Sequence, residues 1–97
     1  MADKIRANYP AMEEMAKQME TVDGRLGELM NSILGIIDLI QSGALQGDPG
    51  DALVTALTLL FNKTSTLATT TGNQAKGIRA AISDMQQADT AATGDFN

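Results

Sequence analysis

In the first half of the chain, apolar residues recur with a spacing that alternates between three and four residues. The series consists of Met12, Met15, Met19, Val22, Leu26, Leu29, Ile33, Ile36 and Ile40. This heptad spacing keeps an apolar seam on one side of an α-helix and is the pattern by which helices pack side by side. We therefore expect a helix over about residues 10–43. Asn8-Tyr9-Pro10 suits its start, since proline is tolerated in a first turn. Gly43 suits its end, where a left-handed residue closes a helix.

A second heptad series follows a glycine-rich segment. Its positions are Leu53, Leu57, Leu60, Thr64, Leu67, Thr71, Gln74, Ile78, Ala81, Met85, Ala88 and Ala92. Asp48 and Pro49 suit the start of a helix, because an aspartate oxygen can cap free amide groups and the φ angle of proline is already helical. The second helix is thus expected over about residues 49–92. Residues 64–72 form its weakest part, since β-branched threonines lower helix propensity.

Two long helices joined by a short turn, here at about residues 44–48, form an antiparallel hairpin. The expected fold is therefore all-α, an antiparallel two-helix hairpin. It occupies residues 1–97 as a single domain and ends in a flexible tail at residues 93–97.

The register of the hairpin follows from matching one seam to the other. In that register Glu20 lies near Lys76, and Glu14 lies near Arg79. Opposite charges at both places favour the match.

The half of the hairpin nearest the turn is apolar on more than one side. Outside the seams it carries Leu34, Ile37, Leu39, Val54, Leu59 and Phe61. A broad apolar surface of this kind typically marks an interface, and two hairpins that bury it together form a four-helix bundle. We therefore expect a dimer, formed with a second copy or with a paralogous hairpin. The residues expected at the hairpin and dimer interfaces are Ile33, Ile36, Ile37, Ile40, Leu53, Leu57, Leu60 and Phe61.

The composition restricts the possible functions. A net charge of −5 argues against binding to nucleic acid or to an anionic membrane surface. Without cysteine or histidine, the chain lacks thiolate chemistry, the usual general base and the usual metal ligands. The apolar stretch at residues 33–40 contains Asp38 and is too short to span a bilayer, so no stable membrane insertion is expected. Residues 1–10 lack the apolar region of a signal peptide, so any export would proceed without a cleaved signal.

Two groups of residues near the turn resemble sites of chemistry, but local structure explains both better. Gly43, Gly47 and Gly50 lack the lysine of a phosphate loop and follow a helix rather than a strand. Asp48 and Asp51 do not have the spacing of a calcium loop and suit the cap of a helix.

The six methionines, which could suggest Cu(I), fall at core spacing. We therefore expect no catalytic residues, no cofactor, no metal site and no enzymatic activity.

Short motifs at the turn and near the C-terminus indicate a family. Leu45-Gln46-Gly47 occupies the turn, and the acidic segment that follows opens the second helix. Met85 and Asp89 are spaced by four residues near the end of that helix. Together with the hairpin plan, this pattern resembles the WXG-100 family (ESAT-6-like proteins), the small helical-hairpin substrates of the type VII secretion system. Leu45 stands where that family has tryptophan in its Trp-x-Gly turn, and Gly47 is the glycine. Met85 stands where the family's Tyr-x-x-x-Asp/Glu export signal has tyrosine.

The resemblance implies a non-enzymatic protein that is cytoplasmic before export and secreted without a cleaved signal peptide. It implies action through homodimeric or heterodimeric helix packing, and recognition by the type VII secretion ATPase. On this interpretation Leu45 and Gly47 mark the turn motif, whereas Met85 and Asp89 present the export signal.

Two other classes of protein fit a short acidic hairpin. One is a polymerising subunit that resembles a type III secretion needle protein, which also has a proline-containing turn. The other is a cytosolic helical adaptor that is not exported. The needle class differs in its assembly, because such subunits form open filaments whereas a type VII hairpin stops at a closed dimer or small oligomer.

Overall fold

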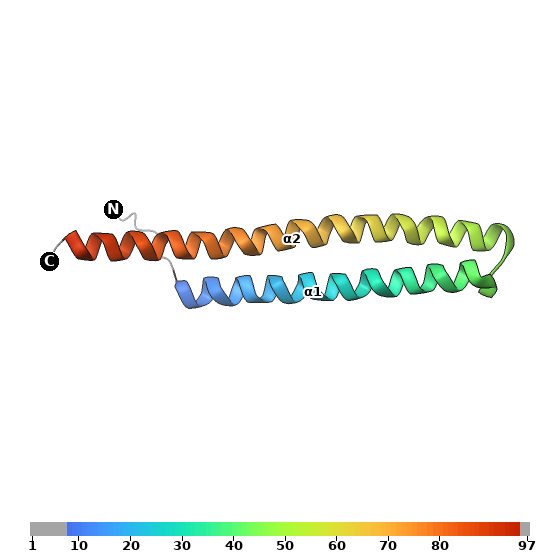
Figure 1. Ribbon diagram of the computed structural model, residues 1–97, viewed down its shortest axis with the longest axis horizontal. Coiled ribbons are helices and arrows are strands. Elements are labelled where there is room, and N and C mark those ends of the chain that lie inside the picture. Colours follow the sequence, from blue (N-terminus) through green and yellow to red (C-terminus); the bar gives the residue numbers. More distant parts are fainter. Residues whose placement is uncertain (1–7, 96–97) are drawn as a thin grey trace.

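The computed structural model describes residues 8–95 and shows an elongated, all-α, antiparallel two-helix hairpin (Figure 1). Helix α1 spans Tyr9–Leu39, a π-helical turn η1 spans Ile40–Ala44, and helix α2 spans Gly47–Asp95. The molecule measures 75 × 22 × 15 Å. Helix α2 has 49 residues against 31 in α1, so it continues past the start of α1 at the end opposite the turn.

The start of α1 lies where the sequence predicts, and the structure shows that Asn8 caps it. The side-chain oxygen of Asn8 accepts a hydrogen bond of 3.1 Å from the backbone N–H of Ala11, and Pro10 lies in the first turn. A side-chain cap of this kind satisfies one of the amide groups that a helix start leaves without an intrahelical partner.

The turn depends on three glycines. Gly43 and Gly47 have φ angles of 110° and 76°, which L-residues with a side chain rarely adopt. Gly50 is needed for a different reason, because a Cβ atom there would collide with the backbone carbonyl of Leu45. The positive φ of Gly43 is the left-handed end expected for the first helix, although the last turn before it is π-helical rather than α-helical.

Helix α2 is longer than expected at both ends. It begins at Gly47 instead of near Pro49. Of the expected flexible tail, residues 93–95 belong to α2 and residues 96–97 lie outside the described residues. Residues 64–72 are helical throughout, because Thr64 and Thr71 are buried in the hairpin and their packing outweighs their low helix propensity.

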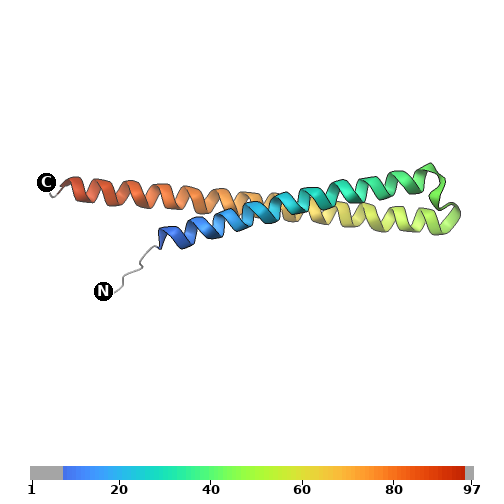
Figure 2. The same ribbon diagram turned by 90° about the horizontal axis from the view of Figure 1, so that it is seen from below.

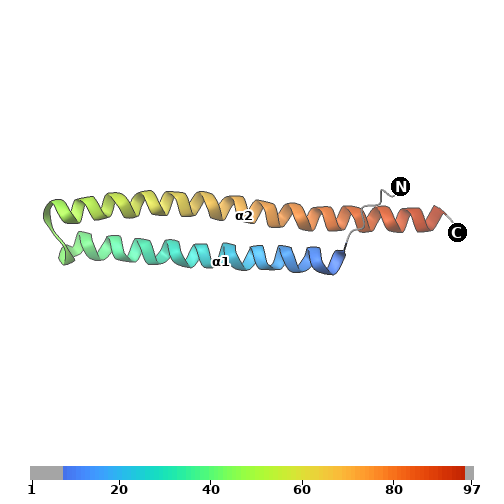
Figure 3. The ribbon, with the colours of Figure 1, turned by 180° about the vertical axis from the view of Figure 1, so that it is seen from behind.

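The two helices pack along a seam in which every position is buried or half-buried. On α1 the seam consists of Met12, Ala16, Met19, Asp23, Leu26, Met30, Ile33, Ile37 and Ile40. On α2 it consists of Val54, Leu57, Phe61, Thr64, Ala68, Thr71, Ala75, Ile78, Ile82 and Met85. Both series keep the heptad spacing. The helices run side by side in Figure 3 and cross in Figure 2. A seven-residue repeat drifts slowly around a straight helix, so two helices that wrap around each other keep their heptad seams in contact.

Half of the expected seam positions are wrong. On each helix every second position of the seam lies one residue later in the sequence than predicted, for example at Ala16 instead of Met15 and at Phe61 instead of Leu60. The physical reason is that small side chains let two helices approach closely. Ala16 and Ala75 are 0% and 1% exposed, whereas the larger Met15 stays outside the seam.

The expected charge register is also wrong. Arg79 pairs with Glu20, at 2.6 Å between Nε and Oε2, rather than with Glu14. Glu20 thus pairs with a residue about one helical turn beyond Lys76 on α2.

Candidate partner-binding face

Eleven large apolar side chains of the described residues are exposed, and seven of them lie in two lines beside the seam. They are Met15, Val22, Leu29 and Ile36 on α1, and Leu53, Leu60 and Leu67 on α2, each between 40% and 52% exposed. On both helices they are spaced by seven residues, so each set forms a straight line along its helix. We call these seven residues the apolar face.

The two lines lie on the same side of the hairpin. Each residue of the apolar face directly precedes a seam residue, as Met15 precedes Ala16 and Leu60 precedes Phe61. Seen from one end of the hairpin, successive residues go clockwise around one helix and anticlockwise around the other, because the two right-handed helices run in opposite directions. The residue before a seam position therefore points to the same side on both helices, and the residue after it points to the opposite side.

The opposite side of the hairpin is polar apart from Leu34, which follows the seam residue Ile33 and is exposed, and its ion pair supports this geometry. Glu20 follows the seam residue Met19, and Arg79 follows Ile78. The guanidinium of Arg79 donates two hydrogen bonds to the Glu20 carboxylate, of 2.6 and 2.8 Å. These bonds hold the pKa of Glu20 below its usual value and raise the pKa of Arg79. A face with a bidentate ion pair and a face of seven apolar side chains thus lie back to back.

The residues predicted for the hairpin and dimer interfaces divide between the seam and the apolar face. Ile33 and Ile40 are buried in the seam, where Ile37, Leu57 and Phe61 are half-buried. The other three, Ile36, Leu53 and Leu60, lie on the apolar face. Sequence reasoning treated these two groups as one surface, because heptad spacing alone does not show which of two adjacent lines faces the second helix.

The apolar face narrows away from the turn. On α1 the line of large side chains continues as far as Met15. On α2 the same heptad position changes from leucine to Gln74, Ala81 and Ala88 after Leu67. The face is therefore built by both helices near the turn and mainly by α1 near the other end.

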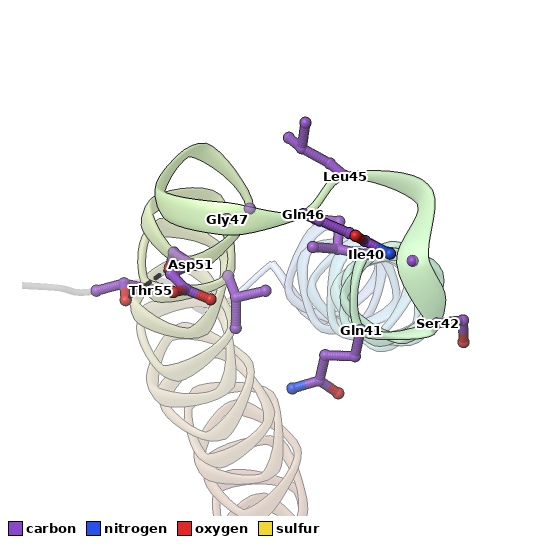
Figure 4. A pocket seen from close by; sticks show the side chains of 11 residues that line it. Ile40, Gln41, Ser42, Leu45, Gln46, Gly47, Asp51 and Thr55 are labelled. Atoms are coloured by element: carbon purple, nitrogen blue, oxygen red, sulfur yellow. Dashed lines mark hydrogen bonds between the residues drawn. The ribbon is translucent and has the colours of Figure 1, made fainter.

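The predicted turn motif lies at the surface. Leu45 is 41% exposed and points away from both helices, and Gly47 begins α2 (Figure 4). The side chain of Gln46 extends back toward Ile40, and its Nε2 atom would lie 3.1 Å from a Cβ built on Gly43. The turn thus presents one exposed leucine on a backbone that glycine keeps compact.

The two residues of the predicted export signal have different surroundings. Met85 is half-buried in the seam. Asp89 is exposed, and its carboxylate accepts a hydrogen bond of 2.5 Å from the hydroxyl of Tyr9 at the start of α1. This bond raises the pKa of Tyr9. Sequence reasoning missed Tyr9 as a partner of Asp89, and the heptad series of the observed seam would have found it, since both residues continue that series.

The described residues hold no group of three or more histidine, cysteine, aspartate or glutamate side chains that could bind a metal ion. Within the same range, neither helix has a stretch both long and apolar enough to cross a membrane. The chain shows no significant similarity to any protein-family model, curated protein or solved structure.

Proposed function

We propose that this protein works by helix packing, and that its apolar face binds a second helical hairpin to form a four-helix bundle. The observation that carries the proposal is the line of exposed apolar residues, which keeps heptad spacing on both helices and lies on one side. Each of these side chains exposes roughly 80 Å², and covering that area contributes about 2 kcal/mol at about 25 cal/mol per Å². A polar face behind it stays in water.

The class of protein we propose is a type VII secretion substrate. Its support is the resemblance to WXG-100 proteins, together with a hairpin in which the Leu45-Gln46-Gly47 motif does form the turn. A second support is the environment of Asp89, where Tyr9 supplies an aromatic hydroxyl that residue 85 does not. In this proposal the protein has no enzymatic activity, is made in the cytoplasm, is recognised by the secretion ATPase and leaves the cell without cleavage.

The packing proposal is tested by placing a charge on the apolar face. Leu29→Asp should abolish association with the partner hairpin, because the charge would be buried in the bundle. The helix content in circular dichroism should stay unchanged, since Leu29 lies outside the seam. Asn31→Asp introduces the same charge at an exposed position of α1 off this face and serves as the control. Unchanged association of the Leu29 variant would contradict the proposal.

The export proposal is tested separately, in cells with an intact type VII apparatus. Asp89→Ala should reduce the amount of protein in the medium, and Asp84→Ala, an exposed control on the same helix, should not. Tyr9→Phe removes only the hydroxyl that bonds Asp89. Protein found only in the cytosol, for the unmodified chain and with its partner present, would contradict export.

A further inference from the structure

We propose that the methionines at the open end of the hairpin are a site of oxidative modification, where sulfoxide formation separates the two helices. The open end lies opposite the turn and consists of residues 9–20 of α1 and residues 78–89 of α2 (Figure 1). The inference concerns the seam within one hairpin. It goes beyond the proposed function and holds whether or not the apolar face is covered.

Methionine is concentrated at the open end. The described residues include five methionines, of which Met12, Met15, Met19 and Met85 lie there and Met30 lies further along α1. Met12, Met19 and Met85 are half-buried seam residues, whereas Met15 is on the apolar face. Near the turn the seam contains hydrocarbon side chains that peroxides do not attack, namely Ile33, Ile37, Ile40, Val54, Leu57 and Phe61. Oxidation of the seam therefore acts mainly away from the turn.

The three seam methionines lie within a short length of the hairpin. The hydroxyl of Tyr9 donates a hydrogen bond to Asp89, and this bond fixes the level of α1 against α2. One turn further into the hairpin, the next seam residues on the two helices are Met12 and Met85. Met19 follows two turns later on α1, so three thioethers occupy about 10 Å of the length of the hairpin.

These thioethers are accessible to a small oxidant. A hairpin of two helices does not enclose a core, and none of the large side chains among the described residues is completely buried. Hydrogen peroxide is little larger than water and reaches sulfur atoms at half-buried positions. One oxygen atom then passes from the peroxide to the sulfur: the O–O bond breaks, an S–O bond forms, the sulfur is oxidised by two electrons and the peroxide leaves as water.

Methionines make up half of the seam at the open end. Its six residues are Met12, Ala16, Met19, Ile78, Ile82 and Met85. A thioether packs there as a flexible apolar group, whereas a sulfoxide is polar and loses hydration when it is held between two helices. The polar contacts at this end, Tyr9–Asp89 and Glu20–Arg79, are exposed and add little stability. Oxidation of the three methionines therefore removes much of what holds the open end together.

The turn half of the seam does not depend on methionine. Ile33 and Ile40 are 2% and 7% exposed there. Sulfoxidation therefore opens the hairpin from the end opposite the turn, breaks the bond between Tyr9 and Asp89, and leaves the turn half paired. The change is reversible, because methionine sulfoxide reductases return a sulfoxide to the thioether.

Peroxide treatment of the full chain, followed by peptide mass spectrometry and hydrogen exchange, tests the proposal. Met12, Met19 and Met85 should each gain one oxygen atom. Amide exchange over residues 9–20 and 78–89 should then become about tenfold faster or more, since a polar group replaces an apolar one in the seam and local opening becomes easier. Exchange over residues 33–40 and 54–61 should stay unchanged. Treatment with methionine sulfoxide reductases should restore the original pattern.

The matched control replaces the three seam methionines with leucine, which has a similar volume and is not oxidised by peroxide. This variant, Met12→Leu with Met19→Leu and Met85→Leu, keeps Met15 and Met30 and should show the same exchange before and after treatment. The reciprocal variant, Met15→Leu with Met30→Leu, should open as the unmodified chain does.

Three results would overturn the proposal. One is seam methionines that stay unmodified while Met15 and Met30 are oxidised. Another is complete oxidation of Met12, Met19 and Met85 with no change in exchange at the open end. The third is equal opening of the unmodified chain and the variant with three leucines. None of these results bears on the apolar face, whose role is tested separately by Leu29→Asp.

Discussion

Ala16 and Ala75 determine which side of each helix faces the other. They are the least exposed of the buried apolar residues in the described part of the chain, at 0% and 1%. Because their side chains are small, the helix backbones come close at these positions, and the larger side chains one position away remain outside. The small side chains of Ala16 and Ala75 thus place these two residues in the seam and leave their larger neighbours on the apolar face.

Enlarging one of these alanines should therefore destabilise the hairpin. Ala75→Leu forces additional atoms into a packed seam and should lower the free energy of unfolding by about 1–3 kcal/mol. Ala80→Leu makes the same change at an exposed position and should have an effect near zero. Urea denaturation followed by circular dichroism, at one fixed protein concentration, measures both. Equal stability of the two variants would show that Ala75 does not set the helix spacing.

The glycines differ in what they contribute. Gly50→Ala should destabilise the protein by about 1–3 kcal/mol, since its Cβ meets the backbone carbonyl of Leu45 and the turn must shift. Gly35→Ala, where nothing lies within 4 Å of the added atom, should stabilise α1 by up to about 1 kcal/mol. Thermal unfolding of the two variants should therefore move in opposite directions. A stabilising Gly50→Ala change would contradict the tight turn.

The ion pair on the polar face predicts a pH dependence. The hydrogen bonds from Arg79 lower the pKa of Glu20 in the folded state. The pair therefore contributes its stability at pH values above the unfolded pKa of glutamate, and this contribution is lost as the pH falls through the lower folded pKa. Both side chains are 47% exposed, so the effect should be small and should decrease in high salt. The fall in melting temperature from pH 7 to pH 3 should be smaller for Glu20→Gln than for the unmodified chain, and an identical fall would contradict the pair.

At the scale of the helices, the sequence predicts much more than it does at the scale of side chains. Both helices, the antiparallel turn and the start of the first helix near Pro10 follow from heptad spacing and from the chemistry of proline and glycine. The choice of seam does not follow, because two adjacent lines on each helix have the same period. Hydrophobicity favours the line with Leu29 and Leu60, whereas close packing favours the line with Ala16 and Ala75.

A charge should have different effects at Leu57, which lies in the seam, and at Ile36, which lies on the apolar face. Leu57→Asp puts a charge into the seam and should unfold the hairpin, which circular dichroism would record as a loss of helix. Ile36→Asp puts the same charge on the apolar face and should leave the helices intact while preventing association. If both variants lose helix to the same degree, the seam and the apolar face are not separate surfaces.

At the scale of the whole molecule, two helices cannot enclose a core. The buried apolar residues are Ala16, Ile33, Ile40, Ala75 and Ile82, and among the described residues no large side chain is completely buried. A bundle of two hairpins would bury the side chains of the seam and of the apolar face in one common core. Folding and assembly should then be coupled, so that the melting temperature rises with protein concentration.

The mode of assembly separates this account from that of a filament-forming subunit. The proposed contact uses the same face on both copies, so it closes after two chains and leaves the polar faces outward. A needle-like subunit would need a second, different contact surface and would grow as the concentration rises. Among the described residues, the side with the Glu20–Arg79 pair carries one exposed large apolar side chain, Leu34, rather than a second line of them.

Sedimentation equilibrium of the purified chain tests most directly whether the apolar face is covered by another copy. Over a wide concentration range the unmodified chain should sediment with twice the mass of one chain, and Leu29→Asp should sediment as a monomer of the same helix content. A monomeric unmodified chain with full helix content at every concentration, or a Leu29→Asp variant that remains a dimer, would contradict the account.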